Sequence, residues 1–187
     1  MSAEPLTDAL LSPRPRPDLQ SRLARLRVPL GFLGAGGALW LAQPTWRSLV
    51  AGAAVSAIGE AVRVWAAGHV EKGREVTKSG PYRWTGHPLY LGSAVIGAGV
   101  TIAARSPWVA LIAAVYLGAT LGAAIRNEEA GLREKFGREY VDYRSGLAVD
   151  ESRRFSLSRA LRNREHRAAI GLVVVFILLA LKIRLML

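Results

Sequence analysis

Residues 88–125 read PLYLGSAVIGAGVTIAARSPWVALIAAVYLGATLGAAI, and the only charged side chain among them is Arg105. Arg105 is preceded by 17 uncharged residues and followed by 20. Because a helix needs about 20 mostly apolar residues to cross a bilayer, each half of this stretch predicts a membrane span. The few residues around Arg105 leave room only for a tight turn, so the two spans are predicted to form an antiparallel hairpin.

Three further tracts have the length and composition of a membrane span. They are residues 28–46, 48–68 and 168–187, and the last carries two basic residues near its end, where long side chains can snorkel to the membrane surface. We therefore expect an all-α, polytopic integral-membrane bundle of about five transmembrane helices. Residues 28–187 are predicted to form a single membrane-embedded domain, preceded by a basic cytosolic tail of residues 1–27.

The basic residues cluster on one side of the predicted spans. The chain holds 25 Lys and Arg against 14 Asp and Glu, a net charge of +11. Such a charge could indicate nucleic-acid binding, but here the basic residues alternate with charge-free tracts, as in a membrane protein that faces anionic lipid headgroups. Twenty of them fall in residues 1–27, 69–87 and 126–167, against four on the opposite side. The positive-inside rule then places these three segments, and the N-terminus, in the cytosol.

The composition excludes several kinds of catalytic site. Without cysteine, the chain has no disulfide, no thiolate nucleophile and no thiolate-bound zinc. The three histidines, His69, His87 and His166, are far apart in the sequence and form no HxxxH pair. No metal site is therefore expected.

Small residues recur within the predicted spans. Gly118 and Gly122 are four residues apart, and Gly97 and Gly99 lie close together in the third span. Such spacing is typical of helices that pack through small faces in a membrane.

A charged segment with an apolar stripe, RNEEAGLREKFGREYVDYR, follows the fourth span at residues 126–144. Its apolar and aromatic residues recur at helical spacing, which predicts an amphipathic helix on the cytosolic membrane face. The stripe consists of Leu132, Phe136, Tyr140 and Tyr143. Glu128 and Glu129 stand at the start of this helix, where acidic side chains also match the helix dipole. Since neighbouring helical positions diverge by about 100°, the two carboxylates are not expected to point at one atom.

A turn rich in rings and donors, GPYRWTGHPLY, leads into the third span at residues 80–90. Pro88 suits the first turn of a helix and places His87 at the helix entrance. Tyr82, His87 and Tyr90 would then surround free N–H groups that favour the acceptor groups of a ligand. The alternative is an interfacial aromatic belt with a capping histidine.

The second predicted span contains Glu60 and Arg63, which lie on one helix face. Ionisable residues inside a membrane usually face a partner or a wet cavity. The pair can serve only to neutralise its own charges and orient helices. Alternatively, Arg63 borders a polar pocket that opens to the cytosol.

The two motifs GPYRxxxHPxYxG and NEExxLxxxFGxEYxxY, in this order and separated by a two-span hairpin, resemble the isoprenylcysteine carboxyl methyltransferase and phospholipid methyltransferase family of integral-membrane enzymes. The resemblance covers about residues 58–144. It implies an S-adenosylmethionine cofactor at the cytosolic face, between the HPxY turn and the glutamates. It also implies a lipid-like acceptor that enters from the bilayer, either an isoprenylcysteine-type carboxylate or a phospholipid amine.

The resemblance assigns roles to residues of both motifs. The catalytic residues that it implies are Glu128 and Glu129, and Arg63, as the residue that borders the predicted polar pocket, is the third catalytic candidate. The cofactor-binding residues that it implies are Tyr82, Arg83, His87, Pro88, Tyr90, Leu91, Gly92, Arg126, Glu128 and Glu129. The family usually has arginine immediately before HP, where this chain has Gly86, so that Arg83, Arg126 or Arg63 would have to replace it. Many relatives also end soon after the glutamate helix, whereas this chain continues through residues 145–187.

The residue types fit methyl transfer from a sulfonium. A sulfonium is a good leaving group, so the reaction depends on alignment more than on acid–base catalysis, and a cation favours aromatic faces and carboxylates. Two other functions fit the same membrane architecture. One is a non-catalytic helical scaffold, and the other is a lipid-modifying reductase, although no phosphate-binding glycine loop follows a strand here.

Overall fold

The structure is a computed structural model that describes residues 31, 33–71, 73–147 and 153–186. All regular secondary structure in these ranges is helical, which confirms the predicted all-α class. From residue 46 onward the helices are α3 (Trp46–Ala67), the 3-10 helix η1 (Gly80–Arg83), α4 (Pro88–Ala104), α5 (Pro107–Phe136), α6 (Arg138–Arg144), α7 (Leu157–Arg162) and α8 (Glu165–Met186).

The chain divides into two compact units, residues 1–37 and 38–187. In the first unit, residues 31 and 33–37 are helical, and the predicted tail of residues 1–27 lies outside the described residues. The helices α3 to α8 all belong to the second unit.

Three helices, α3, α5 and α8, are long and apolar enough to cross a membrane, and α4 is a shorter apolar helix. They correspond to four of the five predicted spans. In the first predicted span, the helix of the second unit ends at Leu41, and Ala42 to Thr45 have no regular structure. This helix therefore stops before the predicted end of the span at residue 46.

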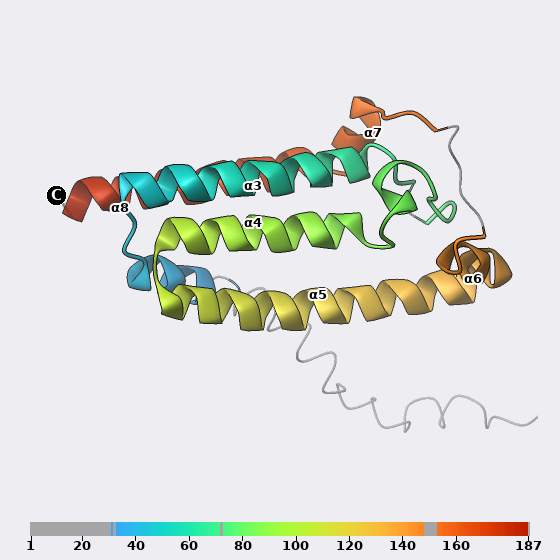
Figure 1. Cartoon of the computed structure of the whole chain (residues 1–187), viewed down its shortest axis with the longest axis horizontal. Helices are drawn as coiled ribbons and strands as arrows, with labels where there is room; N and C mark the ends of the chain where they lie inside the picture. Colours follow the sequence, from blue (N-terminus) through green and yellow to red (C-terminus); the bar gives the residue numbers. More distant parts are fainter. Residues whose placement is uncertain (1–30, 32, 72, 148–152, 187) are drawn as a thin grey trace, which may run out of the picture. The chain divides into compact units, whose positions relative to one another are not determined.

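The boundaries of α3 and α4 follow from local sequence. At the start of α3, Ser48 N–H donates to Thr45 Oγ1 (3.2 Å) and Thr45 N–H donates to Ser48 Oγ (2.9 Å), a capping box that satisfies two N–H groups at the helix start. α4 begins at Pro88, as predicted, and its last residue is followed by Arg105 with a φ of +49°. The chain then reverses into α5, which gives the predicted antiparallel hairpin (Figure 1).

α3 and α4 pack closely because glycines face one another. A Cβ on Gly59 would lie 2.7 Å from the Gly92 carbonyl oxygen, and a Cβ on Gly99 would lie 2.6 Å from the Gly52 carbonyl oxygen. Side chains cannot fit at such distances, so this contact requires glycine. The sequence pattern also indicated Gly118, but a Cβ there would meet no atom within 4 Å. Helix packing through small residues is thus found between α3 and α4 and not at Gly118.

α5 is longer than the predicted fourth span. It has 30 residues, about 45 Å of helix at 1.5 Å per residue, and so extends beyond a hydrocarbon core of about 30 Å. The predicted amphipathic helix therefore begins as a continuation of α5. The reason is that residues 126–136 are mostly good helix formers. The break comes at Gly137, whose φ is +47°, and α6 follows it.

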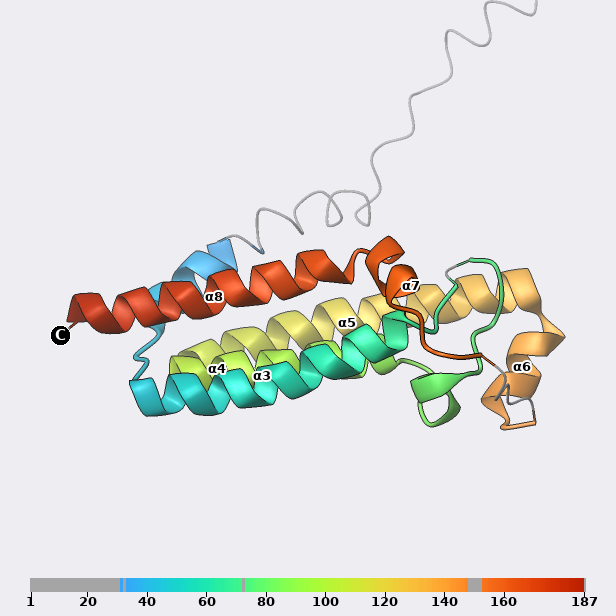
Figure 2. The ribbon, with the colours of Figure 1, turned by 90° about the horizontal axis from the view of Figure 1, so that it is seen from above.

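The last helix, α8, starts three residues before the predicted fifth span and lies alongside α3 (Figure 2). Leu179 of α8 is buried in an apolar cluster with Ala42, Ala103, Ala104 and Val109. This cluster fixes the end of the second unit at which α4 turns into α5. The polar loop after α3, the first turn of α4, the last part of α5, and α6 and α7 all lie at the other end (Figures 1 and 2).

Candidate active site

The short helix η1 brings Tyr82 to one side of a cavity. Gly80, at its start, has a φ of +57°, a conformation that glycine adopts readily. A Cβ at Gly80 would lie 2.7 Å from the ring of His69. Tyr82 is buried, and its carbonyl oxygen accepts a hydrogen bond of 2.7 Å from the Tyr143 hydroxyl of α6. The turn is therefore fixed by contacts at both ends.

The entrance of α4 contacts α5 through His87. His87 Nε2 lies 3.0 Å from Glu129 Oε1. The other ring nitrogen, Nδ1, is buried and has no hydrogen-bond partner within the described residues. The ring centroids of His87 and Tyr90 are 5.8 Å apart. The HPxY turn and the glutamates of α5 thus lie next to each other, although 42 positions separate His87 from Glu129.

The two adjacent glutamates of α5 have different partners. The Glu129 carboxylate contacts His87, and its Oε1 lies 3.4 Å from Nη2 of Arg144. The Glu128 carboxylate instead belongs to the lining of the cavity described below, together with Tyr90. The prediction that the two carboxylates diverge is therefore confirmed.

A cavity of about 550 Å³ lies between these elements, within the range of about 300–1,000 Å³ that is usual for small-molecule sites. Its lining comes from α3, the loop after α3, η1, α4, α5, α6 and the first residue of α8. The charged residues in the lining are Arg63, Glu71, Glu75, Glu128, Lys135 and Glu165. The aromatic residues in the lining are Tyr82, Tyr90, Phe136, Tyr140 and Tyr143.

The lining has an acidic excess although the whole chain has a net charge of +11. Glu71 pairs with Arg159 (2.9 Å) and Glu165 pairs with Arg63 (2.8 Å). Glu75 pairs with Arg153. Glu128 is in no ion pair with the residues that the structure describes. Glu128 and Lys135 are therefore the two charged lining residues without an ion pair in the described chain, and Lys135 Nζ donates to the Gly73 carbonyl oxygen. The Glu128 carboxylate lies among aromatic rings of the lining, and this combination suits a cation.

The apolar stripe that the sequence revealed lines this cavity. Leu132, Phe136, Tyr140 and Tyr143 all belong to the lining. The predicted amphipathic segment is therefore helical, in the last part of α5 and in α6, which Gly137 with its φ of +47° separates. Its place on the cytosolic membrane face stays a prediction.

Burial keeps the tyrosines of this site protonated. Burial raises the pKa of Tyr143 to about 12, and it raises the pKa values of Tyr82 and Tyr140. Their hydroxyl groups are therefore neutral hydrogen-bond donors at physiological pH. The Tyr140 hydroxyl is buried and has no partner within the described part of the chain.

The structure brings only some of the predicted site residues to the cavity. Arg63, Tyr82, Tyr90 and Glu128 line it. The others lie outside its lining: Arg83, His87, Pro88, Leu91, Gly92, Arg126 and Glu129. Of these, His87 and Glu129 contact each other beside the cavity, and Gly92 packs against the Arg63 side chain.

Sequence reasoning missed two residues that contact the predicted site. Glu165 lines the cavity and binds Arg63 from 102 positions away. Arg144 contacts Glu129, and its Nη1 would lie 2.7 Å from a Cβ on Gly86. Arg144 therefore occupies the space beside the position where the family usually has arginine. Neither residue belongs to a motif, so the sequence contained no signal for it.

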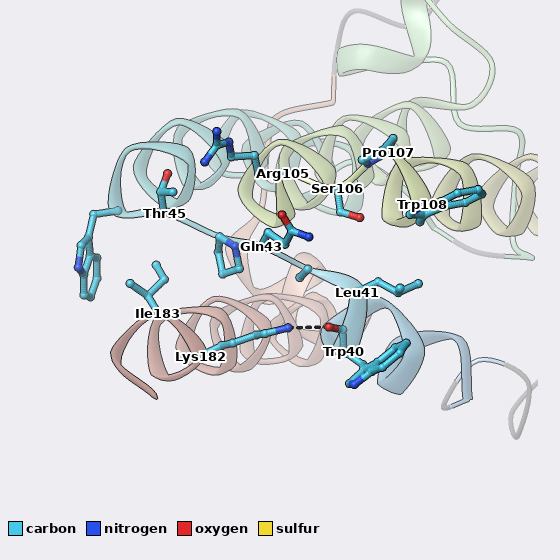
Figure 3. Close-up of a pocket in the computed structure, with 13 residues that line it drawn as sticks. Trp40, Leu41, Gln43, Thr45, Arg105, Ser106, Pro107, Trp108, Lys182 and Ile183 are labelled. Carbon is cyan, nitrogen blue, oxygen red and sulfur yellow. Dashed lines mark hydrogen bonds between the residues drawn. The ribbon is translucent and has the colours of Figure 1, made fainter. Parts of the chain in front are cut away.

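A second cavity, of about 960 Å³, lies at the opposite end of the second unit (Figure 3). Its lining includes Trp40, Trp46, Trp108 and Arg105, and no carboxylate. Lys182 Nζ donates hydrogen bonds of 2.7 Å to the carbonyl oxygens of Leu39 and Trp40. Tryptophans at the end of membrane-length helices are typical of an interfacial aromatic belt. This cavity contains no residue of either motif.

The second unit combines three helices that are long and apolar enough to cross a membrane with a cavity that residues of both motifs line, features typical of a helical membrane protein. The phospholipid methyltransferase family matches residues 35–139, more than half of the chain. The chain belongs to this family, which confirms the resemblance seen in the two motifs and indicates membrane methyltransferase activity. Comparisons with curated proteins and with solved structures find no match.

Proposed function

We propose that the protein transfers a methyl group from S-adenosylmethionine to a lipid-like acceptor at the cytosolic membrane face. One observation carries the proposal: residues of both family motifs, 37 or more positions apart in the sequence, line one cavity of about 550 Å³. Tyr82 and Tyr90 come from the first motif, and Glu128 and Tyr140 come from the second. Membership of the phospholipid methyltransferase family supports the reaction type.

The residues of the cavity fit S-adenosylmethionine. The Tyr140 hydroxyl is a buried donor without a partner in the described chain, and it lines the cavity. His87 Nδ1, beside the cavity, is also buried and unpartnered there. Glu128 supplies the negative charge, and Tyr82 and Tyr90 supply aromatic faces for a cation. When it is bound, the cofactor supplies a methyl group on a sulfonium that is already a good leaving group.

The residues of the chain then have to bind, orient and exclude water. The rings of Tyr82, Tyr90 and Tyr140 line the cavity together with Glu128, so that a cation bound there would meet aromatic surface and a carboxylate. His87 connects the first turn of α4 to α5 through Glu129 and thereby fixes the distance between the two motifs. This alignment of the reacting groups is the main contribution that a protein can make to such a transfer.

The unpaired carboxylate of Glu128 supports an amine acceptor over a carboxylate acceptor. A protonated amine headgroup would be attracted to Glu128, whereas a carboxylate headgroup would be repelled by it. An amine also has to lose a proton before or during the transfer, and Glu128 is the cavity carboxylate without an ion-pair partner in the described residues. A phospholipid amine therefore fits the cavity better than an isoprenylcysteine-type carboxylate.

The proposal is tested on the purified full-length protein in lipid nanodiscs. Isothermal titration with S-adenosylhomocysteine should give saturable heat. Incubation with isotope-labelled S-adenosylmethionine and a mixture of amine phospholipids and farnesylcysteine should place the label on the amine phospholipid, as read by mass spectrometry. A scaffold protein would give no saturable heat. A reductase would instead give saturable heat in a parallel titration with a nicotinamide nucleotide.

A further inference from the structure

The last helix of the chain directs an acidic side chain back into the candidate site. Glu165 is the first residue of α8, is 5% exposed and lines the cavity. It lies outside residues 35–139, which match the family. Its carboxylate accepts hydrogen bonds from Arg63 of α3: Nε to Oε2 (3.1 Å), Nη2 to Oε1 (3.1 Å) and Nη2 to Oε2 (2.8 Å).

The Arg63 guanidinium is also held by α4. Its Nη1 donates a hydrogen bond to Ser93 Oγ. The stem of the side chain packs against Gly92, where a Cβ would lie 2.6 Å from Arg63 Cγ. A guanidinium has five N–H donors in a fixed plane. Glu165 lies on the side of the guanidinium that Nε shares with Nη2, so the Nε–H and one Nη2–H face its carboxylate, and one Nη1–H binds Ser93. One donor on Nη1 and one on Nη2 remain for further acceptors.

A second feature shows that the position of Glu165 is set by the fold. The residue before it, Arg164, has a φ of +64°, which residues other than glycine rarely adopt. Asn163 Nδ2 donates hydrogen bonds to the carbonyl oxygens of Ala67 (2.8 Å) and Val70 (3.0 Å), at the end of α3. The turn between α7 and α8 is therefore fixed on the same helix that carries Arg63.

We propose that Glu165 is a positioning residue. It holds the guanidinium of Arg63 so that a remaining N–H donor, on Nη1 or Nη2, is presented to an acceptor oxygen of the ligand in the cavity. Helix α8, outside the family match, thus completes the site. The assignment of this ligand as the methyl donor or acceptor rests on the proposed function. The claim that Glu165 holds Arg63 in place does not depend on the proposed function.

The first experiment tests the position of Arg63 without any ligand. Full-length wild-type protein, Glu165→Gln and Glu139→Gln in nanodiscs are treated with phenylglyoxal, which modifies accessible arginines, and Arg63 modification is followed by peptide mass spectrometry. Glu139→Gln is the matched control, because Glu139 pairs with Lys78 (2.8 Å) away from the cavity lining. We expect Arg63 to react several-fold faster in Glu165→Gln and at the wild-type rate in Glu139→Gln. Equal rates in Glu165→Gln and wild type would overturn the proposal.

The second experiment separates positioning from a contact that only joins two helices. The double variant Arg63→Glu/Glu165→Arg exchanges the charges and keeps an ion pair between α3 and α8. We expect it to recover the midpoint of thermal unfolding that Glu165→Gln loses. Its methyl-transfer kcat/KM should nevertheless stay about tenfold or more below wild type, since a hydrogen bond to a charged group is worth roughly that factor. Recovery of kcat/KM by the double variant would overturn the positioning role.

The two proposals fail in different ways. If the wild-type protein gave no saturable heat with S-adenosylhomocysteine, the proposed function would be wrong. The phenylglyoxal rates would still decide whether Glu165 holds Arg63, because that measurement uses no cofactor.

Discussion

Glu128 and Glu129 are neighbours in the sequence, but their carboxylates have different environments. Glu128 lines the cavity beside Tyr90, whereas Glu129 contacts His87 and Arg144 outside the lining. If Glu128 meets a cationic group of the ligand, Glu128→Gln should lose a charge-assisted contact of about 1.5–3 kcal/mol. This corresponds to a roughly tenfold to hundredfold weaker affinity for S-adenosylhomocysteine in isothermal titration.

Glu129→Gln should weaken the same affinity less, because Glu129 acts only by holding His87 and Arg144. Glu134→Gln is the control, because Glu134 is an exposed carboxylate on the same helix and outside the cavity lining. Losses of equal size at positions 128 and 129 would contradict the assignment of Glu128 as the residue that contacts the ligand.

Gly86 stands where the family usually has arginine, and the structure shows what surrounds it. Its φ is not positive, so the backbone does not demand glycine there. A Cβ would lie 2.7 Å from Arg144 Nη1, which is the end of a flexible side chain. Gly86→Ala should therefore be tolerated. Gly86→Arg should place two guanidinium groups side by side, displace Arg144 from Glu129 and weaken cofactor binding.

Removing Arg144 tests this explanation of the Gly86→Arg variant. In a double-mutant cycle, Arg144→Ala should restore part of the affinity that Gly86→Arg loses, with a coupling of about 0.5–3 kcal/mol. The measurement is again titration with S-adenosylhomocysteine. If Gly86→Arg alone bound S-adenosylhomocysteine more tightly than wild type, an arginine at position 86 would be compatible with Arg144. Arg144 would then not take the place of the family arginine.

The motifs identified the right region of the site, but single residues were predicted unevenly. Tyr82, Tyr90 and Glu128 belong to the motifs and line the cavity. Glu165 could not be predicted, because it contacts Arg63 across 102 positions of the sequence. Arg144 could not be predicted, because its place beside Gly86 depends on the absence of a Cβ at that glycine. Long-range contacts of this kind follow from the packing of helices and leave no local periodicity in the sequence.

At the scale of helices, the close contact between α3 and α4 supports the site, because both helices contribute to the cavity lining. A Cβ on Gly59 would lie 2.7 Å from the Gly92 carbonyl oxygen and 2.8 Å from the Ile96 nitrogen, which are backbone atoms that cannot move away cheaply. Gly59→Ala should therefore destabilise the protein by about 1–3 kcal/mol. The midpoint of thermal unfolding in a fixed detergent should fall accordingly.

Gly118→Ala on α5 is the matched control for this substitution. A Cβ at Gly118 meets no atom within 4 Å, and alanine is the better helix former by about 1 kcal/mol. Its unfolding midpoint should be unchanged or slightly higher. If Gly59→Ala and Gly118→Ala behaved alike, the close contact between α3 and α4 would not be rigid.

Hydropathy predicted helices better than it predicted their ends and faces. α4 covers the same 17 residues that the sequence indicated, because Pro88 and Arg105 bound it on both sides. α5 was predicted too short, since the hydropathy falls at Arg126 while helix propensity continues to Phe136. Amphipathicity then showed which residues of 126–144 share a face. It could not show whether that face meets a membrane or a cavity.

At the scale of the whole molecule, the distribution of charge predicts an orientation in the membrane. The loop of residues 69–87 and residues 126–147 lie at the end of the second unit that holds the candidate site, and Gln43 and Arg105 lie at the opposite end, in the lining of the second cavity (Figure 3). The excess of Lys and Arg in the first group predicts that this end faces the cytosol. The candidate site would then open where a soluble cofactor is available.

The absence of cysteine makes this orientation directly testable. Single cysteines at Lys78 and Arg138 should react with a membrane-impermeant maleimide only after the cells are permeabilised, because both positions lie at the basic end. A single cysteine at Gln43, which is exposed at the other end, should react in intact cells. The Gln43 variant is thus the positive control for access of the reagent. Labelling at Lys78 or Arg138 in intact cells would reverse the orientation, and it would separate the candidate site from the cytosolic pool of S-adenosylmethionine.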